Sequence, residues 1–194
     1  MRAAVVALSL AGSLALAAPC SAADSPPRRA RVSVALLSGY GFQLDSLLSS
    51  SVSAYRFGFG TRAGITLPCG AYVGGTFITH VGTSVIGARD GASNLVSIAH
   101  DSYLGPEVGY DFTAWGLLLR PYVGTGLLVA FGKTAVGASS IDDTRALYYV
   151  APGGLVAYGM GELLLGVDLR LPIVPAQASK LWAPAAMLTA GMRF

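Results

Sequence analysis

The chain has 194 residues, of which 53% are hydrophobic, 12% are charged and 25 are glycine. A sequence this apolar is not intrinsically disordered, and the many glycines are unusual for a helical membrane protein. The formal net charge of +3 is too small to indicate binding to nucleic acid or to a strongly acidic partner.

The first 23 residues have the pattern of a secretory signal peptide. Arg2 supplies the positive start, residues 3–18 form an apolar core, and residues 21–23 are small. A lipoprotein signal through Cys20 is the alternative, although Pro19 stands where a small residue should precede the modified cysteine. We therefore expect export with cleavage after residue 23.

The mature chain offers no segment for a transmembrane helix. Its longest charge-free run, residues 63–88, is interrupted by Pro68 and by six glycines. A helix needs about 20 continuous apolar residues to cross a bilayer. An exported apolar chain without such a segment can still satisfy its backbone in lipid as a closed β-barrel. The sequence therefore predicts a flexible lead, residues 24–30, followed by a barrel domain, residues 31–194.

Residues 103–131 show the pattern on which this prediction depends. Two runs of alternating side chains are joined by a short turn at residues 113–116, which predicts an antiparallel β-hairpin. One face of each run is almost wholly apolar, whereas the other combines glycines with charged residues. This distribution favours strands that turn one face to lipid and the other to a narrow lumen.

Similar patterning predicts eight strands, at residues 31–42, 54–67, 71–81, 96–112, 117–132, 146–158, 163–172 and 183–194. The second, fourth and sixth connections are short, and the others, including residues 133–145, are long. Outer-membrane barrels have short periplasmic turns and longer outer loops. We therefore predict an all-β fold, an eight-stranded antiparallel up-and-down transmembrane β-barrel.

Some details of the strands stay open. The pattern does not settle which way the strands at 71–81 and 146–158 face, and residues 152–154, Pro-Gly-Gly, predict a bulge or bend. A soluble lipid-binding barrel of the lipocalin type would turn the apolar faces inward instead. The unbroken apolar faces of strands 54–67, 117–132 and 163–172 favour the membrane barrel.

The last strand carries a second signal. Leu188, Ala190, Met192 and Phe194 alternate up to an aromatic last residue, which resembles the terminal signal that marks outer-membrane barrels for insertion. The mature chain as a whole resembles the small eight-stranded outer-membrane β-barrel family, the OmpA-, OmpX- and OmpW-like proteins, in the barrel alone. The resemblance implies a bacterial outer-membrane protein that contacts lipid, lipopolysaccharide and the barrel assembly machinery. A monomer without cofactor or metal is expected.

The predicted inward faces mix acidic and basic residues with glycines. An eight-stranded barrel has an interior only wide enough for side chains to fill, so an ion-paired plug is favoured over a narrow polar conduit. The predicted lumen network consists of Arg56, Arg62, Glu107, Asp111, Arg120, Tyr122, Asp168, Arg170 and Arg193.

The two histidines raise the question of chemistry. His100 and Ser102 lie two residues apart on a predicted outward face, a spacing similar to that in outer-membrane lipid A deacylases. The residue after the serine is Tyr103, where those enzymes carry asparagine, and the strand acid Glu107 faces inward. His80 is expected to lie at the rim rather than to bind a ligand.

These observations favour a structural or surface-interaction role in the outer membrane. The alternatives are passage of small or hydrophobic solutes through the barrel and, less favoured, hydrolysis of lipid A. Aromatic residues near the predicted strand ends are expected to form girdles at the two membrane interfaces: Tyr40, Phe42, Tyr110, Phe112, Trp115, Tyr158 and Trp182.

Overall fold

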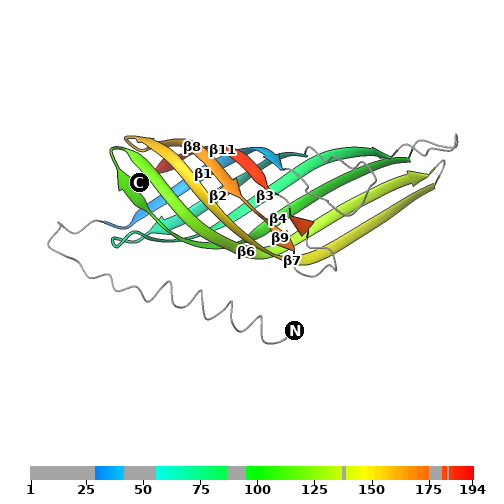
Figure 1. The fold of residues 1–194 in the computed structure, drawn as a ribbon, viewed down its shortest axis with the longest axis horizontal. Helices are drawn as coiled ribbons and strands as arrows, with labels where there is room; N and C mark the ends of the chain where they lie inside the picture. Colours follow the sequence, from blue (N-terminus) through cyan, green and yellow to red (C-terminus); the bar gives the residue numbers. More distant parts are fainter. Residues whose placement is uncertain (1–28, 42–55, 87–94, 137–138, 175–180, 183) are drawn as a thin grey trace, which may run out of the picture.

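In a computed structural model, the chain forms one barrel of long tilted strands (Figure 1). The structure describes residues 29–41, 56–86, 95–136, 139–174, 181–182 and 184–194. The predicted signal peptide and most of the predicted lead therefore lie outside the described residues, as does Phe42. No helix among the described residues is long and apolar enough to cross a bilayer.

Eight strands form the wall: β1 Arg31–Gly41, β2 Arg56–Thr66, β3 Ala71–Ile86, β4 Leu95–Tyr110, β6 Leu117–Val136, β7 Ser139–Met160, β8 Leu163–Arg170 and β11 Ala185–Arg193. Three short strands accompany them: β5 Phe112–Ala114, β9 Ile173–Val174 and β10 Leu181–Trp182.

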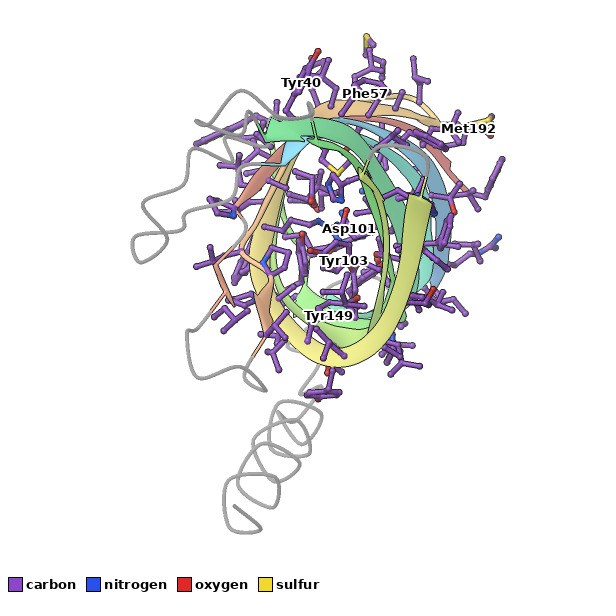
Figure 2. The ribbon with its side chains drawn as sticks, turned by 90° about the vertical axis from the view of Figure 1, so that its right-hand side faces the viewer. Tyr40, Phe57, Asp101, Tyr103, Tyr149 and Met192 are labelled. Atoms are coloured by element: carbon purple, nitrogen blue, oxygen red, sulfur yellow. The ribbon has the colours of Figure 1, made fainter. Side chains whose placement is uncertain are left out.

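The wall closes because the last strand pairs with the first. Each wall strand is antiparallel to its neighbours in the order β1-β2-β3-β4-β6-β7-β8-β11, and β11 returns to β1 with Met192 opposite Val34. The prediction of an all-β, eight-stranded antiparallel up-and-down barrel is confirmed. Figure 2 shows the closed ring end on.

The register fixes the tilt of the strands. A row of cross-strand partners that leaves β1 at Arg31 returns to β1 at Gly41, ten residues further along. At about 3.3 Å per residue and about 4.8 Å per strand, this stagger over eight strands gives a tilt of about 40°. A barrel of this size has an interior that side chains fill.

Side chains alternate between the lumen and the outer surface. On β1, Ser33, Ala35 and Leu37 are buried, whereas Val34 and Leu36 are exposed on the outside. Figure 2 shows Tyr40, Phe57 and Met192 projecting outward and Asp101, Tyr103 and Tyr149 inward. The lipocalin-type alternative is therefore wrong, because the apolar faces point out and the charged faces point in.

The structure also settles the two strands whose facing was open. On β3, Tyr72 and Ile78 face the lumen and Val73 and Phe77 face outward. On β7, the odd-numbered residues from Tyr149 to Ala157 face the lumen, except that Gly153 is half-buried there. The lumen also contains three apolar clusters: Leu37, Ile78 and Met187; Leu118, Leu155, Ala157 and Leu164; and Tyr103, Leu128, Tyr149, Ala151 and Val174.

The two ends of the barrel differ. The short connections at 67–70, 115–116 and 161–162 lie at one end, together with the C-terminus (Figure 1). We call this the turn end. At the opposite end the β3–β4 and β6–β7 hairpins run on beyond the other strands (Figure 1). We call this the hairpin end.

Two predictions about β6 and β7 are wrong. The expected loop at residues 133–145 is largely strand, because β6 continues to Val136 and β7 begins at Ser139. The expected bulge at 152–154 is absent, because the pairing of β7 with β6 runs without a shift from Tyr158 to Ser139. A polar segment can remain strand once it projects out of the apolar layer, since it no longer needs an apolar face.

Candidate functional site in the barrel lumen

Four buried charged residues form a closed ring in the lumen. Arg62 contacts Glu107 (Nε to Oε2, 2.8 Å) and Asp168 (Nη1 to Oδ2, 2.8 Å). Arg170 contacts the same two acids, Asp168 from Nε at 2.9 Å and Glu107 from Nη2 at 3.5 Å. Each side chain is at most 6% exposed. The ring has no net charge, and each of its charges faces two of opposite sign, which makes its burial tolerable.

Tyr122 completes this ring from β6. Its hydroxyl donates to both carboxylate oxygens of Asp168, at 2.8 and 3.0 Å. The guanidinium carbon of Arg62 lies 4.6 Å from the centre of the Tyr122 ring. Gly153 makes room for this ring, because a Cβ at residue 153 would lie 2.5 Å from the phenol carbon Cζ of Tyr122. The glycine-rich inner face therefore accommodates an aromatic residue on which an arginine packs.

A second polar layer lies nearer the turn end. Arg120 donates to both carboxylate oxygens of Asp111, at 2.5 and 2.8 Å, in the forked geometry that suits a guanidinium and a carboxylate. The Thr66 hydroxyl donates to Asp111 at 2.7 Å. The guanidinium carbon of Arg120 stacks 3.5 Å from the ring centre of Tyr72, and Gly74 leaves space for that ring.

A third group faces the lumen toward the hairpin end (Figure 2). His80 is 4% exposed, and its Nδ1 lies 3.8 Å from Oδ1 of Asp101 on the neighbouring strand. The Tyr103 hydroxyl donates to Asp101 at 3.4 Å, and its ring meets those of His80 and Tyr149 edge to face. The expectation that His80 lies at the rim is wrong, because β3 is longer than predicted and places this residue inside the barrel.

The structure places the predicted lumen residues in different surroundings. Seven of the nine are buried in the ring or in the second layer: Arg62, Glu107, Asp111, Arg120, Tyr122, Asp168 and Arg170. Arg193 is half-buried at the turn end, where it lines a depression with Arg29 and Arg31. The side chain of Arg56 lies outside the described residues.

Sequence reasoning missed several members of these layers, among them Thr66, Tyr72, His80 and Asp101. Three of them are on even-numbered positions of β2 and β3, where the lumen-facing residues are Arg62, Thr66, Tyr72, Thr76, Ile78 and His80. On β3, Tyr72, Thr76 and His80 stand at alternate positions and could have indicated which side faces the lumen. The pair Gly74–Gly75 obscured this alternation.

His100 and Ser102 share the outer face, and each side chain contacts a different residue. The exposed ring of His100 stacks on Phe131 at 4.6 Å, and the Ser102 hydroxyl donates to Thr79 Oγ1 at 3.1 Å. No hydrogen bond joins His100 to Ser102 in the part of the chain that the structure describes. Nor does any group of three or more His, Cys, Asp and Glu residues there have an arrangement that would hold a metal ion.

The outer surface bears exposed aromatic residues near the turn end. Tyr110, Phe112, Trp115, Tyr158 and Phe194 are all more than 40% exposed. Trp115 lies in a two-residue hairpin turn with Gly116, and both have positive φ, 52° and 79°, as a type I′ turn requires. Among the predicted girdle residues, Trp182 has a side chain outside the described part of the chain.

The residues of the predicted terminal signal all point outward. Leu188, Ala190, Met192 and Phe194 are exposed on β11 or directly after it. The backbone of Phe194 exchanges two hydrogen bonds with Val32, at 2.9 and 3.1 Å. The end of the chain is therefore part of the closing seam, while its aromatic ring stays available on the outside.

No protein-family model matches the sequence, and no curated protein matches it. Solved structures, in contrast, do match the fold. The structure of Ail, the attachment invasion locus protein of Yersinia pestis, is similar with a TM-score of 0.55 and 13% identity, over 85% of this chain and 97% of Ail. A major outer membrane protein from Thermus thermophilus gives a TM-score of 0.57 and 16% identity, over 86% of this chain and 100% of that one. The chain therefore has the fold of the small eight-stranded outer-membrane β-barrels.

Proposed function

We propose that this chain is a bacterial outer-membrane protein whose hairpin end projects from the cell and binds an extended segment of a partner at the surface. The observation that carries the proposal is the open edge of β7. Residues 139–149 of β7 pair with β6 along their whole length. On the other side, the pairing of β7 within the described residues begins only at Val150, opposite Ile173 of β9.

The open edge has a defined polarity. The Pro152 carbonyl accepts a hydrogen bond from Leu171 N, so it points away from β6. Because the N–H and C=O of one strand residue point to the same side, the even-numbered residues Thr144, Ala146 and Tyr148 direct their backbone groups to the open side. Such a row of donors and acceptors is a template for adding a strand from another chain.

A role at the surface agrees with the structural neighbours. Ail is, by its name, an attachment and invasion protein. Solute passage, the alternative, is favoured by no specific observation, because the ring of Arg62, Glu107, Asp168 and Arg170 fills the lumen with paired buried charges. We expect the barrel to give no stable conductance in planar bilayers.

Proline substitutions at the open edge test the proposal. The double variant Thr144→Pro/Ala146→Pro removes two N–H donors that face the open side and leaves the hydrogen bonds of β7 to β6 in place. The matched control, Thr144→Ala/Ala146→Ser, changes the same two side chains but keeps both donors. Cells displaying each protein would be compared for adherence to bacterial cells, eukaryotic cells and matrix-coated surfaces.

We expect the wild-type and control proteins to confer adherence on at least one of these surfaces and the proline variant to lose most of it. Equal adherence of all three proteins, or none by the wild type, would contradict a partner on the β7 edge. A heat-dependent gel shift of each variant shows that the barrel itself is folded.

Orientation is tested separately with an epitope tag. A tag inserted between residues 137 and 138 should be labelled by antibody on intact cells, whereas one between residues 161 and 162 should be labelled only after the outer membrane is broken. The reverse pattern would place the hairpin end in the periplasm and refute the proposal.

A further inference from the structure

The turn end of the lumen contains arginines that the ion-paired layers do not use. Arg29, Arg31 and Arg193 line a depression at the mouth of the barrel, together with Asp111, Thr66 and Thr113. Arg31 and Arg193 both occupy lumen-facing positions on adjacent strands, since Arg193 is opposite Ser33 and Arg31 is two residues before it. The Arg193 side chain extends to β7, where its Nη2 would lie 3.7 Å from a Cβ at residue 159.

The acid in this depression is already engaged. Asp111 accepts two hydrogen bonds from Arg120 and one from Thr66. Among the described residues, no ion pair joins Arg29, Arg31 or Arg193 to a carboxylate. Glu162 is a second acid nearby, and it is exposed in the β7–β8 turn, where its backbone carbonyl accepts from Arg193 N at 2.7 Å.

The charges at the mouth are therefore unbalanced. Arg29, Arg31, Arg120 and Arg193 carry four positive charges, whereas Asp111, Glu162 and the terminal carboxylate of Phe194, which pairs with Val32 beside Arg31, carry three negative ones. The half-buried Arg193 lies closest to low-dielectric surroundings, where repulsion between like charges is strongest. This arrangement contrasts with the central ring, in which every charge has two partners of opposite sign.

We propose that the turn-end mouth binds a phosphate-type anion between Arg31 and Arg193, with Arg29 as a third, more exposed contact. Guanidinium groups bind phosphate oxygens through paired N–H donors, and a bound anion would compensate the excess positive charge at the mouth. The Thr113 hydroxyl, on the same depression, is a further donor. The anion would come either from a soluble phosphate compound or from the headgroup of an anionic lipid at the rim.

Inorganic pyrophosphate is a suitable probe, because it is small, highly charged and has no apolar part. Its binding to the folded barrel in neutral detergent at low salt would be measured by calorimetry. We expect one site, and we expect the variant Arg31→Gln/Arg193→Gln to bind at least tenfold more weakly. The matched control Lys133→Gln/Arg145→Gln loses the same net charge on the strands of the β6–β7 extension and should bind like the wild type.

Stability gives a second readout. The loss of like-charge repulsion should leave Arg31→Gln/Arg193→Gln at least as stable as the wild type to heat. Pyrophosphate should raise the melting temperature of the wild type and of the control but not that of this variant. Absence of binding to the wild type, or equal weakening in the variant and in the control, would overturn the proposal.

Bilayer composition distinguishes the two sources of the anion. The same titration would be made in nanodiscs of phosphatidylcholine, with and without phosphatidylglycerol. A large fall in pyrophosphate affinity when phosphatidylglycerol is present supports a lipid headgroup as the occupant. Equal affinity in the two bilayers supports a soluble anion, and no binding in either bilayer refutes the site.

Discussion

Each residue of the central ring depends on the opposite charges beside it. Glu107 contacts Arg62 and Arg170 while less than a tenth of any of the three side chains is exposed. A buried pair of charges adds little compared with apolar residues of the same volume, but removal of one partner leaves the other charge without compensation. The ring therefore specifies how the lumen packs, and its energetic effect is visible mainly when one member is changed alone.

The first prediction concerns this coupling. Glu107→Gln leaves two guanidinium groups facing the single carboxylate of Asp168, so we expect a loss of about 3–5 kcal/mol in the free energy of unfolding. Arg62→Gln/Glu107→Gln removes one charge of each sign and should be less destabilised than the sum of the two single variants. Urea unfolding of the barrel in phospholipid vesicles, followed by tryptophan fluorescence, measures the free energy of unfolding of Glu107→Gln, of Arg62→Gln and of the double variant. Strict additivity would show that the ring is not coupled.

The second prediction compares two adjacent glycines of β7. In Gly153→Ala the new methyl group would meet the Tyr122 ring and the Leu169 carbonyl, at 2.5 and 2.7 Å, so the ring must shift and its bond to Asp168 weakens. In Gly154→Ala the methyl group points outward and nothing lies within 4 Å of it. We expect a loss of about 1–3 kcal/mol for Gly153→Ala and almost none for Gly154→Ala, measured by the same unfolding assay. Equal effects would mean that space beside Tyr122 is not what residue 153 provides.

At the scale of elements, alternation predicted the strands well where one face meets lipid. The outward faces of β2 and β8 agree with prediction at each of Phe57, Phe59, Leu165, Val167 and Leu169, because a shift of one residue would bury all these side chains in the polar lumen. Alternation failed for the outer parts of β6 and β7. Segments such as Ser139–Thr144 have no lipid-facing pattern, so their polarity was misread as a loop, although backbone pairing between the two strands keeps them extended.

The lumen was harder to predict than the wall. Parity along β4, β6 and β8 was enough to place Glu107, Arg120 and Asp168 inside. It could not show that Arg170 would contact Glu107, because that pairing depends on the ten-residue stagger of the whole barrel. The position of His80 was lost with the length of β3, since the predicted strand ended at residue 81, whereas β3 continues to Ile86 and so places His80 away from the rim.

The closing strand gives the third prediction. Phe194 is 61% exposed beside the β1–β11 seam, and its backbone rather than its ring completes the pairing with Val32. If the ring is the signal for assembly, Phe194→Ala should lower the amount of folded barrel in the outer membrane several-fold and leave refolding of the purified protein in detergent unchanged. Trp115→Ala, at an aromatic residue that is 97% exposed in a turn, is the control. Similar loss in both variants would assign the effect to the aromatic girdle instead.

On the scale of the whole molecule, the barrel has an apolar outer surface, a filled lumen and two unlike ends. The turn end is closed by tight connections and bears arginines that form no ion pair with a described carboxylate, whereas the hairpin end carries a β7 edge that no described strand covers. An apolar exterior of this extent is stable only in lipid or detergent, because large exposed apolar patches drive association in water. The proposal of a partner on the β7 edge depends on this placement in the outer membrane.

The most direct test of that placement is cell fractionation followed by gel electrophoresis with and without heating. We expect the protein in the outer-membrane fraction, and we expect the unheated sample to migrate differently from the heated one, because a closed barrel resists detergent until it is heated. A protein recovered in the soluble fraction, with the same mobility before and after heating, would contradict a membrane-spanning barrel.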